Sequence, residues 1–132
     1  SSKELAKNAK IVNRYLATRL KGSPTELYNA AAYLIVNGGK RLRPFMVLKS
    51  CEILGGKLKD GIPAASAVEM IHNFTLVHDD IMDDAPLRRG KETVHEKWDL
   101  NTGILSGDAM LIMAYQLFEG FEASVQKELI QF

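Results

Sequence analysis

The sequence is poor in the features that mark secreted or membrane-spanning proteins. Its 132 residues include one cysteine, four prolines and no long hydrophobic run. Cys51 cannot form a disulfide within the chain and is typical of a reducing compartment, so we expect a cytoplasmic protein. The longest apolar stretches, residues 30–36 and 109–115, fall far short of the roughly 20 residues of a spanning helix. We therefore expect no transmembrane segment.

The chain also lacks a strong excess of charge of either sign. Its 17 Lys and Arg and 16 Asp and Glu give a formal net charge of +1. We expect no nucleic-acid partner. The near-neutral total charge says little else about partners, because the charges are clustered. The clusters are Lys40, Arg41 and Arg43, then Arg88, Arg89 and Lys91, and four aspartates between residues 79 and 84.

Apolar residues recur at helical spacing along most of the chain, and no segment shows a credible strand pattern. We expect one all-α unit over residues 1–132, an antiparallel helix bundle. Ser23 is expected to cap the second helix, with Glu26 as its capping-box partner. Asp60 and Gly61 are expected to form a turn before the fourth. The predicted helices cover residues 3–20, 24–36, 45–54, 64–83, 101–118 and 121–130, and residues 87–92 are expected to form an exposed basic loop.

Three aspartates at the end of the fourth predicted helix are candidates for a metal site. Asp79 and Asp83 are four residues apart, so their carboxylates share one helix face, and Asp80 lies beside them. Like charges at the C-terminus of a helix are unfavourable without a compensating cation. Oxygen ligands without a nearby Cys favour a hard ion such as Mg²⁺, which fills its remaining positions with water and phosphate oxygens.

A solvated acidic helix end is the simpler explanation of any pair of aspartates, but basic residues nearby favour a diphosphate site. Arg88 and Arg89 follow by a short loop, and Lys40 and Arg43 stand at a predicted helix start. Carboxylates alone would repel a diphosphate, whereas carboxylates with a metal and arginines bind it. His72, two turns before the first aspartate on the same face, is as consistent with a structural hydrogen bond as with a ligand role.

Three segments, in this order and at this spacing, resemble the polyprenyl (trans-isoprenyl) diphosphate synthases. They are Gly38-Gly39-Lys40-Arg41-Leu42-Arg43-Pro44, Asp79-Asp80-Ile81-Met82-Asp83 and Leu87-Arg88-Arg89-Gly90-Lys91. The resemblance implies a helix bundle of the isoprenoid synthase type. It also implies a Mg²⁺-dependent prenyltransferase that condenses isopentenyl diphosphate with an allylic diphosphate.

The resemblance assigns a role to each matching residue. Asp79 and Asp83 would bind the metal, and the catalytic set would be Asp79, Asp80, Asp83 and Arg88. Isopentenyl diphosphate would contact Lys40, Arg43, His72 and Arg89, whereas Arg88 would touch the allylic diphosphate. Phe74 and Thr75, which precede the aspartates, would set the product length. An aromatic residue at only the first of these positions resembles the short-chain (C15–C20) farnesyl and geranylgeranyl diphosphate synthases.

One departure from the family pattern is as informative as the matches. The family has a second aspartate-rich motif on a later helix, and these 132 residues contain none. We therefore expect an incomplete, N-terminal portion of the synthase domain, inactive alone. The resemblance also implies a homodimer, and residues 104–118 are the candidate for the subunit contact. A non-catalytic partner or helical interaction fragment of the same fold is the alternative. A magnesium-dependent phosphohydrolase would need a general base, and none is evident beside the aspartates.

Overall fold

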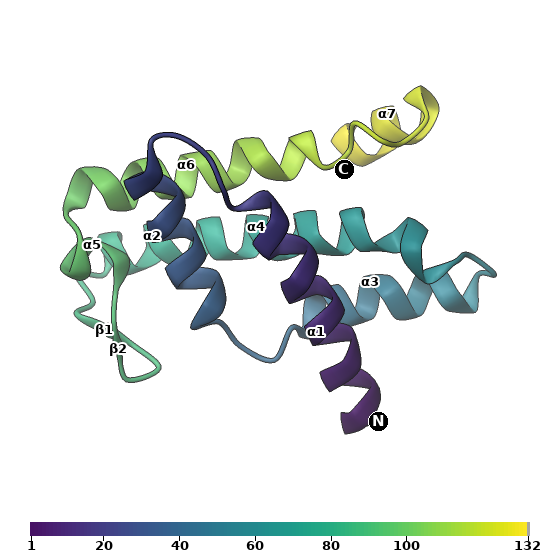
Figure 1. The fold of residues 1–132 in the computed structure, drawn as a ribbon, viewed down its shortest axis with the longest axis horizontal. Coiled ribbons are helices and arrows are strands. Elements are labelled where there is room, and N and C mark those ends of the chain that lie inside the picture. The colour runs from purple at the N-terminus through teal and green to yellow at the C-terminus, as the bar shows by residue number, and fades with distance from the viewer. Residues whose placement is uncertain (132) are drawn as a thin grey trace.

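The fold is helical, as the sequence predicts. A computed structural model describes residues 1–131 and contains seven helices and one two-stranded hairpin in that part of the chain (Figure 1). The elements are α1 (Ser2–Arg19), α2 (Thr25–Val36), α3 (Leu42–Ile53), α4 (Leu58–Met82), β1 (Leu87–Arg88), β2 (Lys91–Glu92), α5 (Val94–Lys97), α6 (Leu100–Gln116) and α7 (Ala123–Gln131).

The 25-residue helix α4 is the centre of the arrangement. Helices α3 and α6 pack along opposite sides of α4 and run antiparallel to it, while α1 and α2 cross this layer at a steep angle (Figure 1). The hairpin and α5 lie at the same end of the molecule as the C-terminus of α4. The predicted aspartates and the predicted basic loop are therefore brought to one end.

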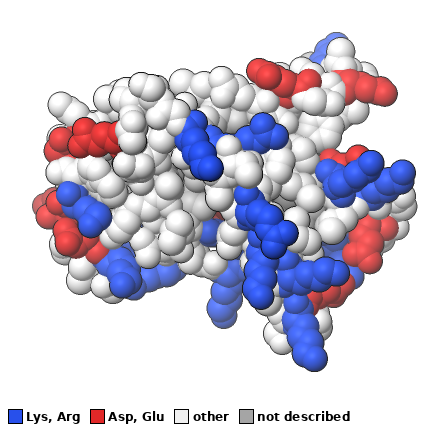
Figure 2. Space-filling view, in the orientation of Figure 1, with Lys and Arg blue, Asp and Glu red and all other residues white. Residues whose placement is uncertain are grey.

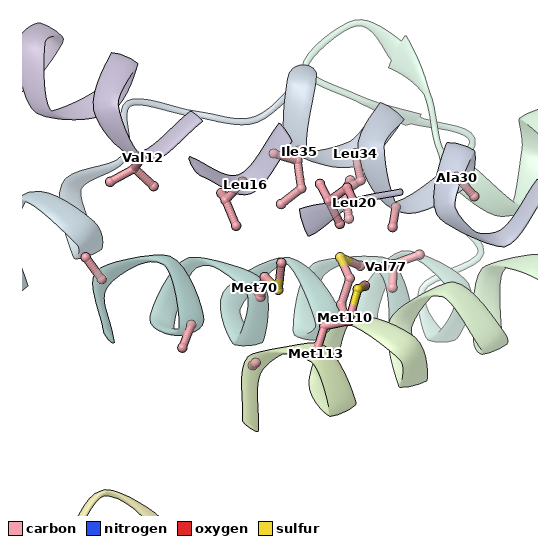
Figure 3. Close-up of a cluster of buried hydrophobic side chains, with 14 of the residues drawn as sticks. Val12, Leu16, Leu20, Ala30, Leu34, Ile35, Met70, Val77, Met110 and Met113 are labelled. Atoms are coloured by element: carbon pink, nitrogen blue, oxygen red, sulfur yellow. The ribbon is translucent and has the colours of Figure 1, made fainter. Parts of the chain in front are cut away.

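The core lies where α1 and α2 meet α4 and α6. In Figure 3 the apolar side chains of α1 and α2 point down onto Met70 and Val77 of α4, with Met110 and Met113 of α6 beside them. Met70, Val77 and Met110 are fully buried. Truncation of such a side chain to Ala typically costs about 2–5 kcal/mol.

Helix α1 is amphipathic, as its spacing predicts. Its inner face buries Val12 and Leu16, and its outer face exposes basic residues, which cover the α1 region in Figure 2. No helix among residues 1–131 combines the length and the apolar character that crossing a bilayer requires.

The expected turn at Asp60 and Gly61 is wrong, because α4 already begins at Leu58 and runs through both residues. Gly61 is buried there, and a Cβ in its place would lie 3.2 Å from Cδ2 of Leu48. The glycine therefore serves the close approach of α3 and α4 rather than a turn.

The expected cap at Ser23 is also wrong. Helix α2 begins at Thr25, and the extended Pro24, with φ −70° and ψ 137°, takes the N-cap position without a side-chain hydrogen bond. Ser23 thus lies one residue too far from the first turn for its hydroxyl to cap the helix.

The basic loop contains a short hairpin that the sequence pattern did not predict. Leu87 pairs with Glu92 and Arg88 with Lys91. The two turn residues both have positive φ, 50° at Arg89 and 76° at Gly90, which is the geometry of a tight two-residue hairpin turn. Alternation cannot be recognised in strands of two residues, so sequence periodicity gave no signal.

Candidate active site

The last turns of α4 carry the predicted acidic residues to the open end of the molecule. Asp79 and Asp83 are exposed and one turn apart, whereas Asp80 is only 5% exposed. Asp83 is the C-cap, and its N–H donates to the carbonyl of Asp79 at 2.8 Å. Two exposed carboxylates at the negative end of a helix dipole repel each other, and a divalent cation would relieve that repulsion.

Asp80 has a different environment from its two neighbours because Arg88 binds it from the hairpin. Nε and Nη2 of Arg88 donate to the two carboxylate oxygens of Asp80, each at 2.9 Å. This hydrogen bond with Asp80 raises the pKa of Arg88. The fork geometry occupies both oxygens of Asp80 but leaves Nη1 of Arg88 outside the pair. A diphosphate could therefore contact Arg88 only through the remaining N–H groups.

Two further hydrogen bonds hold the hairpin in place. The hydroxyl of Thr93 donates to the carbonyl of Ala85 at 2.8 Å, and the hydroxyl of Tyr33 on α2 donates to the carbonyl of Glu92 at 2.8 Å. The hairpin is thus tied to α2 and to the segment that follows α4, and Arg89 stands at its turn. Adjacent arginines consequently serve different contacts, since Arg88 binds Asp80 and Arg89 reaches the pocket described next.

The predicted basic residues meet around one pocket of about 300 Å³. The loop between α2 and α3, helix α4 and the hairpin turn all contribute to its wall. Gly39 leaves room for the end of the Arg89 side chain, since a Cβ there would lie 2.9 Å from Nη2 of Arg89. The lining residues are Gly39, Lys40, Arg41, Leu42, Arg43, Glu69, His72, Asn73, Leu76 and Arg89.

Three cations of this pocket have no carboxylate partner within residues 1–131: Lys40, Arg43 and Arg89 form none of the ion pairs found there. Nη1 of Arg43 lies 3.3 Å from Nε2 of His72. Burial lowers the pKa of His72, and the positive charge of Arg43 lowers it further. A neutral His72 can accept a hydrogen bond from Arg43, which leaves the positive charge of the pocket on the lysine and the arginines.

Phe74 and Thr75 lie one to two turns before the aspartates on α4. Phe74 is partly buried and packs edge-on against His78, with ring centroids 4.8 Å apart. Thr75 is exposed, and its hydroxyl donates to the carbonyl of His72 at 2.6 Å. Phe74, the bulky member of the pair predicted to set the product length, therefore packs against a residue of its own helix.

Sequence reasoning missed a buried ion pair in the wall of the pocket. Arg41 is 4% exposed and Glu69 is also 4% exposed, and Nη1 of Arg41 donates to Oε1 of Glu69 at 3.0 Å. The available signal was Glu69 itself, because a carboxylate in a largely apolar helix segment requires a buried partner. Spacing alone could not identify which basic residue that partner would be.

The exposed carboxylates fit Mg²⁺ in chemistry, since Asp79 and Asp83 offer hard oxygen donors on one helix face. A second group of possible ligands follows them. Donor atoms of Asp84, His95 and Glu96 lie within 4.8 Å of one another. Asp84 and Glu96 are exposed, and exposed acidic groups commonly gather without an ion, so we assign no metal to this second group.

The fold and the site define a helical protein whose acidic helix end adjoins a basic pocket. Residues 24–131 match the model of the polyprenyl synthetase family. The chain therefore belongs to that family, and the resemblance stated from its motifs is confirmed.

Named relatives in this family are prenyl diphosphate synthases. The geranylgeranyl diphosphate synthase of Methanosarcina mazei is 48% identical over 99 residues, which cover 75% of this chain and 31% of the relative. The farnesyl diphosphate synthase of Micrococcus luteus is 43% identical over 108 residues, which cover 80% of this chain and 37% of the relative. The chain thus spans about a third of the length of these curated relatives.

Solved structures show the same fold. A crystal structure of a geranylgeranyl pyrophosphate synthase superposes with a TM-score of 0.91 at 51% identity, covering 99% of this chain and 39% of that one. The geranylgeranyl pyrophosphate synthetase of Pyrococcus horikoshii gives a TM-score of 0.92 at 38% identity, covering 98% of this chain and 41% of that one. The all-α fold of the prenyl diphosphate synthases is therefore confirmed for this chain.

Proposed function

We propose that this chain carries the first part of the active site of a trans-prenyltransferase, which joins isopentenyl diphosphate to an allylic diphosphate. The observation that supports this most directly is the basic pocket beside the acidic helix end. Lys40, Arg43 and Arg89 line the pocket without a carboxylate partner in residues 1–131. Unpaired cations around a pocket of this size suit a diphosphate group.

The proposed reaction assigns separate tasks to the two parts of the site. Mg²⁺ held by Asp79 and Asp83 would supply positive charge against the leaving diphosphate. Arg88, which Asp80 orients, would add N–H donors to the same group. The allylic C–O bond breaks, and its electron pair leaves with the diphosphate, so that C1 becomes electron-poor.

The pocket would hold the second substrate by its diphosphate. Lys40, Arg43 and Arg89 would fix isopentenyl diphosphate, and the neutral His72 would keep Arg43 in position. The double bond of isopentenyl diphosphate attacks C1 of the allylic group, and the released diphosphate accepts the proton that is lost. Fixing both reactants in this way replaces a bimolecular encounter by an oriented reaction.

Asp79→Asn in the natural-length protein tests this proposal. We expect the Mg²⁺-dependent incorporation of labelled isopentenyl diphosphate into butanol-extractable product to fall by on the order of 10²–10³-fold, the scale found when one charge-stabilising group is removed. Asp84→Asn is the matched control, because Asp84 is exposed, has a φ of 49° that Asn tolerates, and belongs to no proposed binding set. A wild-type protein that binds diphosphate but makes no product would support the non-catalytic alternative instead.

We further propose that the product is short, C15 to C20, with Phe74 limiting its growth. Several relatives bear the names of geranylgeranyl and farnesyl diphosphate synthases. Phe74→Ala is expected to lengthen the products resolved by reversed-phase chromatography. Unchanged product length in Phe74→Ala would disprove this role.

We also propose that residues 1–132 are one unit of a larger synthase domain that forms a homodimer through α6. Ile104, Leu105 and Ile112 of α6 are 39%, 54% and 59% exposed, which leaves apolar surface open to a partner. Light scattering of the natural-length protein should give twice the chain mass. A monomer at micromolar concentration would exclude this assembly.

A further inference from the structure

Arg41 is the one buried residue of the loop between α2 and α3. Its guanidinium donates from Nε to Oδ1 of Asn13 at 2.7 Å, from Nη1 to Oε1 of Glu69 at 3.0 Å, and from Nη2 to the carbonyl of Ile35. The three acceptors belong to α1, α4 and α2, respectively. One side chain therefore ties the loop to three helices at once.

The backbone at Arg41 determines the direction of its neighbours. Arg41 is the N-cap of α3 in the left-handed conformation, with φ 61° and ψ 38°, and its carbonyl accepts from the N–H of Phe45 at 3.0 Å. Lys40 precedes this turn and Arg43 follows it, and both are exposed and line the pocket. Any rotation of the loop at Arg41 would redirect both side chains.

Two further residues accommodate the buried guanidinium of Arg41. Nδ2 of Asn73 donates to Oε1 of Glu69 at 3.2 Å, which orients the carboxylate toward Arg41. Gly38 leaves room on the other side, because a Cβ there would collide with Nη1 of Arg41 and lie 2.9 Å from the carbonyl of Ile35. The site is therefore built around this side chain.

The energetics favour a positioning role over a stabilising one. A buried ion pair costs about as much desolvation as it recovers, and well-packed apolar residues of similar size are often at least as stabilising. A non-glycine residue in the left-handed region adds a further cost of about 1 kcal/mol or more. The chain nevertheless places a charged, left-handed residue at the point that orients two pocket cations.

We propose that Arg41 is a positioning residue, which acts through Glu69 and Asn13 to hold Lys40 and Arg43 in the orientation that binds the diphosphate of isopentenyl diphosphate. This inference rests on the proposed function, since it assigns to Arg41 the geometry of that substrate pocket. Arg41 is assigned no substrate contact in this arrangement, because its side chain is only 4% exposed and three of its five N–H groups already donate to the protein.

The double variant Arg41→Met/Glu69→Gln tests the proposal in the natural-length protein without leaving a buried charge unpaired. We expect cooperative unfolding to be retained while the KM for isopentenyl diphosphate rises about ten- to hundredfold, the scale of a small misplacement of binding groups. The KM for geranyl diphosphate and kcat at saturation should stay within about twofold of wild type, because Asp79 and Asp83 are untouched. A change confined to one KM is not expected from a merely structural role.

Two additional variants keep the test decisive. Arg41→Lys retains the charge but cannot donate to three helices at once, so a folded Arg41→Lys protein should also show a raised KM for isopentenyl diphosphate. Lys49→Met is the matched control, because Lys49 on α3 pairs with Glu4 on α1 at 2.7 Å but is 34% exposed, and all kinetic constants should be unchanged.

The outcomes separate this inference from the proposed function. A folded Arg41 variant with an unchanged KM for isopentenyl diphosphate, or with both KM values raised equally, would overturn the positioning role. Absence of turnover in the wild-type protein would overturn the proposed function. In that case the affinity for inorganic diphosphate, measured by calorimetry, should still fall about tenfold in Arg41→Lys, and unchanged affinity would overturn the inference as well.

Discussion

Charged residues around the pocket form two contrasting groups. Arg41 and Glu69 are almost completely buried and bonded to each other. Lys40, Arg43 and Arg89 are exposed, line the pocket and form no ion pair within residues 1–131. The difference indicates that paired charges hold the site in shape, whereas unpaired charges are available to a ligand. The number of charges in a cluster would not distinguish these tasks.

Substitutions at the two adjacent arginines test this difference between paired and unpaired charges with the largest expected effect. Arg88→Met should lower the free energy of unfolding by about 2–3 kcal/mol because it leaves Asp80 buried and unpaired. This is somewhat less than the roughly 3–5 kcal/mol of a fully buried pair, since Arg88 itself is 27% exposed. Arg89→Asn, which suits the left-handed turn position, should change stability by less than about 0.5 kcal/mol but weaken diphosphate binding. Urea denaturation and calorimetry measure the two effects.

The double variant Asp80→Asn/Arg88→Met is the control for this pair of substitutions. Removal of both charges should recover most of the stability lost in Arg88→Met, because no buried charge remains unpaired. Equal losses of stability in Arg88→Met and Arg89→Asn would contradict the division between paired and unpaired charges.

Substitutions at Gly38 and Gly39 test the same difference between paired and unpaired charges, with a smaller expected effect. Gly38→Ala should destabilise by about 1–3 kcal/mol, since its Cβ meets the buried Arg41 and the backbone carbonyl of Ile35. Gly39→Ala meets only the terminal atoms of Arg89, which can move, so stability should hold while diphosphate affinity falls a fewfold. Thermal denaturation and calorimetry of both proteins check this, and a stable Gly38→Ala protein would show that Arg41 is not held as tightly as its contacts indicate.

Sequence periodicity predicted most of the fold because helices are local. The buried positions of α4 recur at helical spacing, and the aspartates at its end follow from the same register. The features that the sequence did not predict depend on distant neighbours. Gly61 was expected to form a turn because its contact with Leu48 of α3 is not encoded in its own segment. The hairpin was missed because its strands have only two residues each.

The same distinction applies to the candidate site. The acidic and basic residues could be found from sequence because the chemistry of a magnesium-diphosphate site limits the residue types. Which arginine stays free for a ligand could not be found, because the pairing of Arg41 depends on Glu69 and Asn13, each 28 positions away in sequence. Local patterns therefore predicted the composition of the site, and only tertiary packing separated its binding residues from those that orient them.

His72 provides the smallest test, because its pKa responds both to its burial and to the charges around the pocket. Burial lowers this pKa, and the positive charges of Arg43, Arg89 and Arg88 lower it further, while Glu69 opposes them. With a folded-state pKa below the ordinary value of about 6.5, the unfolded chain binds the proton more readily. The free energy of unfolding should therefore be unaffected above pH 6.5, fall as the pH drops below 6.5, and level off under the folded-state pKa.

Urea denaturation from pH 7.5 to 5 should show this decline in stability, and the decline should be weaker in His72→Gln. Equal slopes in the two proteins would mean that neither burial nor the pocket cations lower the pKa of His72.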